Sequence, residues 1–188
     1  MLLSDLQEFE WYNEPENVVF RDKSMHITAQ PYTDFWQSHH RGYGIDNGHF
    51  FFNRKQGDFN FVAKWDFSQC PPYSQCGVML RIDEKNWFKA AVMYDTPEKP
   101  MLATTVTQNG FSDMAAQDAL IRTDSIWFKI KRFKGDYFIL FSFDGSSFRQ
   151  IRLLYLQNDT PEVKVGAYIC SPRDSEFEAI LSQMVFEN

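Results

Sequence analysis

Alternation of apolar and polar residues over short segments constrains this chain more than any other feature. Between residues 59 and 67 every second residue is Phe, Ala or Trp, and Asn60, Lys64 and Asp66 lie among the residues between them. Segments 78–83 and 87–94 alternate in the same way. Because successive side chains of a strand point to opposite faces, each segment is predicted to be a strand with one buried face. Residues 60–94 therefore predict a three-strand antiparallel meander.

The second hairpin of this meander has a register that the same pattern indicates. A three-residue loop at 84–86 brings the apolar sets of segments 78–83 and 87–94 onto one face. A four-residue loop would place Lys89 opposite Leu80 and turn a charge toward the core, which is costly. The expected pairs are Ile82 with Phe88 and Leu80 with Ala90. The opposite face of the sheet is then expected to carry Arg81, Asp83, Trp87 and Lys89.

The rest of the chain favours one all-β domain over residues 1–188. A length of 188 residues allows a substantial core, and no Gly/Ser-rich, Pro-rich or charged linker divides the chain. Aromatic residues make up 17% of the sequence and fall mostly in short alternating segments. Segment 112–118 lacks this pattern and is expected to be a loop or an irregular helical turn. We expect two packed antiparallel sheets, because one sheet of about a dozen strands would leave an aromatic face in water.

The charge of the chain opposes a nucleic-acid partner. The net charge is −6 and the pI is near 5.2, whereas phosphate binding needs a positively charged surface. Lys129 and Lys131 alternate with apolar residues and form, with Arg132 and Lys134, a basic cluster. This cluster is interpreted as the solvated face of a strand.

No segment of the sequence predicts a membrane partner or export. Residues 1–6 are too short, and are followed by too many acids, to resemble a signal peptide, and no apolar run approaches the ~18 residues of a membrane span. A cytoplasmic location is therefore predicted. Cys70, Cys76 and Cys170 form an odd set without metal-ligand spacing, which predicts free thiols.

Several short segments, taken in order along the chain, resemble one protein family. They are 33–36 (TDFW), 57–59 (GDF), 77–81 (GVMLR), 87–89 (WFK), 112–113 (SD), 143–145 (FDG) and 165–168 (VGAY) with 171–172 (SP). The chain is similar through them to the domain-of-unknown-function family that includes the fungal regulation-of-enolase protein. This resemblance implies a concanavalin A-like jelly-roll sandwich of two antiparallel sheets with one concave face. It implies no activity, because the family has none assigned. The chain departs from the family pattern at Met114 and Met93.

The first functional hypothesis is a non-catalytic module that binds a carbohydrate or a sugar-like polar ligand on the concave sheet. Sugars need an aromatic platform and polar groups that meet their hydroxyls. Trp87 would supply the platform, and Arg81, Lys89 and Asp113 the polar groups. The long loop over 31–48 would wall this face with Asp34, Trp36, Tyr43 and Asp46. The alternative is that the charged residues form an ordinary solvated strand face and that Trp36 belongs to the core.

Two further hypotheses are kept. A glycoside hydrolase needs two carboxyl groups about 5 to 9 Å apart, and no stretch matches the Glu-x-Asp-x-x-Glu pattern of many glucanases of this fold. The pairs Glu8/Glu10 and Glu176/Glu178 are interpreted as outward-facing acids. An enzyme is therefore not favoured. The third hypothesis is a regulatory protein that binds another protein.

No metal or cofactor is expected. His39 and His40 are adjacent and would point to opposite faces of a strand, and the separation from them to His49 matches no familiar ligand spacing. The sequence also lacks a phosphate-cradling glycine loop and a nucleophile motif.

Overall fold

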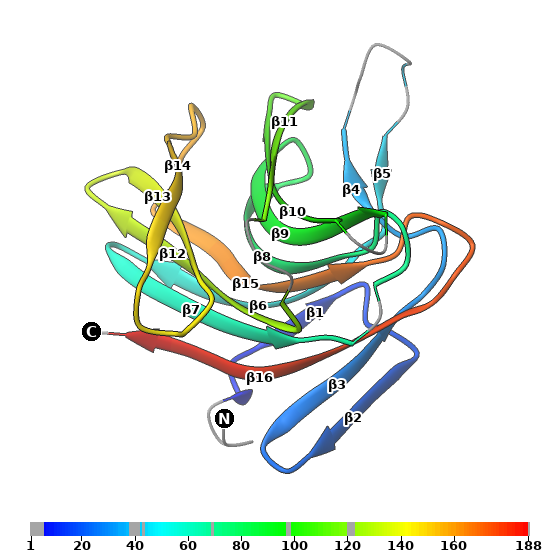
Figure 1. The fold of residues 1–188 in the computed structure, drawn as a ribbon. Coiled ribbons are helices and arrows are strands. Elements are labelled where there is room, and N and C mark those ends of the chain that lie inside the picture. The colour runs from blue at the N-terminus through cyan, green and yellow to red at the C-terminus, as the bar shows by residue number, and fades with distance from the viewer. Residues whose placement is uncertain are drawn as a thin grey trace.

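The computed structural model describes residues 6–37, 42, 44–68, 70–96, 99–119 and 123–187. Within these ranges the chain forms two curved antiparallel sheets that pack face to face, and it contains no α-helix (Figure 1). This confirms the two packed antiparallel sheets that the alternating segments predict, and the jelly-roll-like sandwich that the family resemblance implies.

One seven-stranded sheet, here called the front sheet, has the order β1-β6-β15-β8-β9-β10-β11. Its strands are β1 (Glu10–Tyr12), β6 (His49–Gln56), β15 (Glu162–Cys170), β8 (Gln75–Asp83), β9 (Asn86–Thr96), β10 (Lys99–Gln108) and β11 (Phe111–Asp118). The back sheet, also of seven strands, has the order β14-β13-β12-β7-β16-β3-β2. Its strands are β14 (Arg149–Leu154), β13 (Asp136–Ser142), β12 (Ser125–Phe133), β7 (Phe59–Asp66), β16 (Phe177–Glu187), β3 (Ser24–Ala29) and β2 (Asn17–Arg21).

A third, two-stranded sheet consists of β4 (Phe35–Trp36) and β5 (Ile45–Asp46). In Figure 1 this hairpin stands beside the front sheet, away from the back sheet. The long loop expected over 31–48 therefore contains a strand pair of its own. The face that this hairpin approaches is called here the outer face of the front sheet.

The main core lies between the two large sheets and follows strand alternation. The even-numbered residues Val78, Leu80, Phe88, Ala90, Val92 and Tyr94 all belong to it. From β7, the indole N–H of Trp65 donates to the carbonyl oxygen of Gly77 at 2.8 Å, so the two sheets are also joined by a buried hydrogen bond. The predicted inward face of β8 and β9 is thus confirmed.

The predicted register of the β8–β9 hairpin is wrong by two residues. Leu80 lies opposite Phe88, Asp83 lies opposite Asn86, and the register shifts between Arg81 and Asp83. The turn is therefore shorter than expected, and the Asp83 carboxylate closes it by accepting hydrogen bonds from the backbone N–H of Lys85 and the side chain of Asn86. The bulge at Ile82 adds one unpaired residue to β8. The residues of β8 and β9 therefore lie on their predicted faces although the predicted loop length is wrong.

Segment 112–118 is a strand, β11, and not a loop or a helical turn. It pairs with β10 from Gln108 opposite Phe111 to Met101 opposite Asp118. The turn at Asn109 and Gly110 has both residues at positive φ, as a tight two-residue hairpin turn requires. The strand lies at the edge of its sheet and nearly all of its residues are exposed, so the sequence shows no alternation there.

One member of the predicted surface cluster of basic residues lies on the core side of its strand. Arg132 is buried, and its guanidinium donates to the Asp159 carboxylate at 2.7 Å and to the carbonyl oxygens of Thr160 and Pro161. The alternation of side chains along β12 explains this burial. Arg132 follows Ile126, Phe128 and Ile130 in steps of two, and these three residues belong to the main core.

Candidate ligand-binding cleft

The β4–β5 hairpin covers part of the outer face of the front sheet and builds a second core there. Phe35 is fully buried, and its ring meets the ring edges of Trp87 and Tyr168 at centroid distances of 6.3 and 6.2 Å. The buried members of this second core are Phe35, Phe50, Phe52, Met79, Trp87, Ala91, Tyr168 and Cys170. The concave face is therefore not an open trough where the hairpin lies.

Two ion pairs attach the hairpin to the front sheet. The Arg81 guanidinium donates to both carboxylate oxygens of Asp46, at 2.6 and 2.7 Å, and lies 4.4 Å from the ring centre of Tyr12. The Tyr12 hydroxyl also donates to Asp46, at 2.8 Å. Burial alone would lower the pKa of Arg81, but the hydrogen bond and the charge of Asp46 raise it overall. The guanidinium is thus held in its charged form against its carboxylate.

The second ion pair joins Lys89 to Asp34. The ammonium Nζ of Lys89 lies 2.8 Å from Oδ1 of Asp34, and the same oxygen accepts the backbone N–H of Phe35 at 2.7 Å. The ammonium also lies 5.4 Å from the ring centre of Tyr168 and 6.0 Å from that of Trp87. Lys89 is thus a buried cation with a fixed counter-ion.

The structure brings some of the predicted site residues together and separates others. Arg81, Trp87 and Lys89 share the outer face, as predicted, but Trp87 is 0% exposed and cannot serve as an open platform. Asp113 lies opposite the core residue Val106 on the other face of the sheet, and it is 3.4 Å from Arg152. Tyr43 lies outside the described residues.

A cleft of about 520 Å³ remains on the outer face, beside the hairpin, and two of its walls are aromatic. Its lining consists of Asp34, Trp36, Ile45, Tyr73, Gln75, Lys89, Met93, Asp95, Met101, Thr105, Met114, Pro172 and Arg173. Trp36 pairs with Ile45, whereas Phe35 pairs with Asp46, so the hairpin turns one face to the second core and the other to the cleft.

The floor of the cleft follows from the register of β8 to β11. One row runs across the strands from Lys89 through Thr105 to Met114, and a second runs from Gln75 through Met93 to Met101. Between them lies a row of small residues, Gly77, Ala91, Ala103 and Ala116. The side chains of the two outer rows line the cleft, and Ala91 of the row between them belongs to the second core.

The polar groups of the floor are fixed by neighbours. Gln75 is buried, its side-chain oxygen accepts the Tyr168 hydroxyl at 2.9 Å, and its side-chain nitrogen donates to the carbonyl oxygen of Tyr73 at 3.3 Å. Burial raises the pKa of Tyr168 well above its ordinary value, which keeps the hydroxyl a donor. On the far wall the Arg173 guanidinium lies 4.7 Å from the ring centre of Tyr73.

Sequence reasoning missed most of the lining. Thr105 and Met101 follow from strand pairing once Lys89 and Met93 are placed, so a full register would have found them. Tyr73, Pro172 and Arg173 come from loops, and no periodic signal points to them. Their place is set by long-range contacts such as the hydrogen bond between the Ser74 and Ser171 hydroxyls at 2.9 Å.

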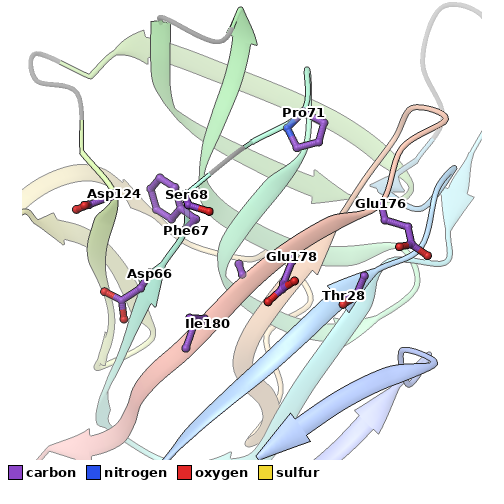
Figure 2. A pocket seen from close by; sticks show the side chains of 10 residues that line it. Thr28, Asp66, Phe67, Ser68, Pro71, Asp124, Glu176, Glu178 and Ile180 are labelled. Carbon is purple, nitrogen blue, oxygen red and sulfur yellow. The ribbon is translucent and has the colours of Figure 1, made fainter. Parts of the chain in front are cut away.

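A second hollow, of about 610 Å³, lies on the back-sheet side and is acidic (Figure 2). Its lining includes Asp66, Asp124, Glu176 and Glu178. Asp66 is already paired with Lys64 at 2.8 Å and accepts a hydrogen bond from Ser182. Glu176 and Glu178 are exposed, as predicted.

The histidines and cysteines form no metal site within the described part of the chain. His49 is buried, its Nδ1 lies 2.6 Å from the carbonyl oxygen of Asn13, and its Nε2 accepts the backbone N–H of Gln30 at 3.3 Å. His39 and His40 lie outside the described residues. The three cysteines are free, and burial raises the pKa of Cys70 to about 12 and that of Cys76 and Cys170 well above its ordinary value.

Fold and cleft define a jelly-roll-like β-sandwich with a ligand-sized depression beside a covering hairpin. Residues 11–188 match the family described as "Protein of unknown function (DUF1349)", and the chain belongs to that family. It is 24% identical over 180 residues to Regulation of enolase protein 1 of Saccharomyces cerevisiae, with 96% of this chain and 89% of that protein covered.

Solved structures give the same picture of the fold. A functionally unknown protein from Saccharomyces cerevisiae superposes with a TM-score of 0.89 at 25% identity, covering 97% of each chain. Carbohydrate binding module CBM66 from Bacillus subtilis superposes with a TM-score of 0.62 at 11% identity over 98% of each chain. The GH43 protein BlXynB from Bacillus licheniformis reaches a TM-score of 0.74 at 13% identity, covering 95% of this chain and 36% of that one. The last two likenesses concern the fold alone.

Among the described residues, no helix is long and apolar enough to cross a membrane.

Proposed function

We propose that this protein is a non-catalytic binding module that holds a carbohydrate or a sugar-like polar ligand in the cleft beside the β4–β5 hairpin. The observation that carries the proposal is the meeting, in one cleft of about 520 Å³, of two accessible aromatic rings with buried polar side chains. The rings are those of Trp36 and Tyr73, and the buried polar side chains are Gln75, Lys89 and Thr105.

This combination suits a sugar for a physical reason. A pyranose ring has an apolar face of C–H groups, which packs on an aromatic ring, and a rim of hydroxyls, which need donors and acceptors. Trp36 is half-buried and Tyr73 is exposed, so both rings have surface to offer. The volume lies within the range of clefts that bind small molecules. The fold shared with a carbohydrate binding module supports the same proposal.

Binding without catalysis fits the state of Asp34, one of the two carboxylates that line the cleft. Hydrolysis of a glycosidic bond needs one carboxyl group that gives a proton and another that attacks or activates water. The Asp34 oxygen Oδ1 is held by Lys89 and by the backbone of Phe35. Such a carboxylate can still accept a hydrogen bond from a ligand hydroxyl, because a carboxylate has several acceptor positions.

The test is a glycan array followed by calorimetry of the hits on the wild-type chain. Trp36→Ala should weaken binding of a hit about tenfold or more, since aromatic stacking is worth about 1.4 kcal/mol here. Tyr155→Ala is the matched control, because Tyr155 is also an exposed aromatic residue (60%) but lies outside the cleft. No binding to any glycan, or equal loss in both variants, would remove the support for this function.

The second candidate is an intracellular regulatory protein that binds another protein. It is favoured by the name of the yeast relative, Regulation of enolase protein 1. A pull-down from cytosol tests it, with Trp36→Ala as the variant. Capture of one defined protein by both forms, together with a blank glycan array, would favour this candidate over the first.

A further inference from the structure

We infer that the cleft selects an uncharged saccharide over its phosphorylated or carboxylated counterparts, and that Asp34 sets this preference by neutralising Lys89. The inference rests on the proposed function and concerns the same cleft. It starts from the observation that a buried cation lines the cleft and is not free to act as an anion site.

Lys89 by itself would attract anions. Its side chain is 4% exposed, and a positive charge in such surroundings acts more strongly than one in water. A phosphate or carboxylate group on a sugar would therefore be a natural partner for it. Asp34 removes that option, because its Oδ1 already lies 2.8 Å from the ammonium nitrogen. An incoming anion would meet the Asp34 carboxylate at the same place.

Positive and negative side chains are equal in number in the described lining of the cleft. The described lining carries two cations, Lys89 and Arg173, and two anions, Asp34 and Asp95. The formal charge of the described lining is therefore zero. Gln75 and Thr105 on the floor are uncharged. A ligand with a net charge would gain no overall attraction and would have to give up its hydration.

An uncharged polyol fits the Asp34–Lys89 pair well. An ammonium group has three donor hydrogens, and a carboxylate has several acceptor positions, so an ion pair still offers donors and acceptors to a third group. One hydroxyl can accept from Lys89 while its neighbour on the ring donates to Asp34. Hydrogen bonds to charged groups are the stronger kind. The pair is therefore a receptor for adjacent hydroxyls.

The experiment is calorimetry with the full chain and matched probes. The probes are neutral di- and trisaccharides of hexoses such as glucose, galactose and mannose, and for each hit the 6-phosphate or the uronic acid form. The wild-type chain should bind the neutral form about tenfold more tightly than the charged form. Asp34→Asn leaves Lys89 uncompensated and should reverse this order, with tighter binding of the charged form.

A matched control separates selectivity from damage to the hairpin. Asp46→Asn removes the other carboxylate of an ion pair between the hairpin and the sheet, and Asp46 does not line the cleft. Any loosening of the hairpin should lower the affinity for both forms by the same factor and leave the ratio unchanged. Lys89→Met should change the ratio of the two affinities in the opposite direction to Asp34→Asn. Asp34 is then uncompensated, so the charged form should bind still more weakly.

The outcomes distinguish the inference from the function on which it rests. A wild-type chain that prefers the phosphate or the uronate, or an Asp34→Asn variant that binds sugars with the wild-type ratio, would overturn the inference and leave sugar binding in place. If Asp34→Asn does not fold, Lys89→Met takes its place: the wild-type ratio of affinities for the neutral and charged forms in this variant would overturn the inference. Failure of every saccharide to bind the wild-type chain would instead overturn the proposed function.

Discussion

Arg81 holds both carboxylate oxygens of Asp46, with Nη1 at 2.6 Å from Oδ1 and Nη2 at 2.7 Å from Oδ2. The two residues are 35 positions apart in sequence, and the pair joins β8 of the front sheet to β5 of the covering hairpin. Together with the Lys89–Asp34 pair it makes the hairpin part of the fold instead of a free loop.

Loss of the Arg81 charge should therefore loosen the hairpin. Arg81→Leu leaves Asp46 without its counter-ion, and we expect the free energy of unfolding to fall by about 2 to 3 kcal/mol. This is below the usual cost for a fully buried pair because the Asp46 side chain is 21% exposed. Urea unfolding measures the loss, and a double-mutant cycle with Asp46→Asn measures the coupling. A coupling energy near zero would show that the pair does not hold the hairpin.

Replacement of the two tryptophans at the outer face should have different consequences, for stability in the case of Trp87 and for ligand binding in the case of Trp36. Trp87 is fully buried in the second core, so Trp87→Ala should lower stability by about 3 to 5 kcal/mol. Trp36 is half-buried at the cleft, so Trp36→Ala should cost about 1 kcal/mol or less and weaken ligand binding instead. Thermal unfolding of both variants checks this. Near-wild-type stability of Trp87→Ala would contradict its place in the second core.

His49 should make stability depend on pH in the mildly acidic range. Burial lowers its pKa below the ordinary 6.5, and the hydrogen bond to the Asn13 carbonyl offsets this in part. The unfolded chain therefore binds the proton at a higher pH than the folded chain. Stability is complete above about pH 6.5 and falls as the pH drops from there toward the folded pKa.

The check is a comparison of unfolding midpoints in urea at about pH 7.5 and about pH 5. The wild-type chain should lose more stability between these two values than His49→Gln, which cannot take up the proton. Protonation would also place a donor at Nε2 opposite the backbone N–H of Gln30. Parallel losses in the two proteins would show that His49 does not carry the effect.

Strand parity was the part of the fold that the sequence allowed us to predict. Val78, Leu80, Phe88 and Ala90 face the main core because period-two alternation is a local property of the backbone. The loop length was not predictable in the same way. A bulge at Ile82 changes the count of residues without changing which face is apolar, so alternation cannot detect it.

The burial of Trp87 could not be read from alternation either. Its strand shows one apolar and one mixed face, and a mixed face is normally solvated in an antiparallel sheet. The covering element comes from residues more than 40 positions earlier, Phe35 and Asp46, and contact between such distant segments leaves no periodic trace. The pairing of Asp34 with Lys89 and of Asp46 with Arg81 is hidden for the same reason.

Ligand binding in the cleft is measured most directly by NMR of the methionine methyl groups during titration with a neutral saccharide identified by the array. Met93, Met101 and Met114 line the cleft, whereas Met25 and Met184 belong to the main core and serve as internal controls. A saccharide bound in the cleft should cause saturable shifts of the three cleft methyl signals and none of the two core signals. Binding that moves the core signals, or that leaves the cleft signals in place, would show that the ligand binds elsewhere.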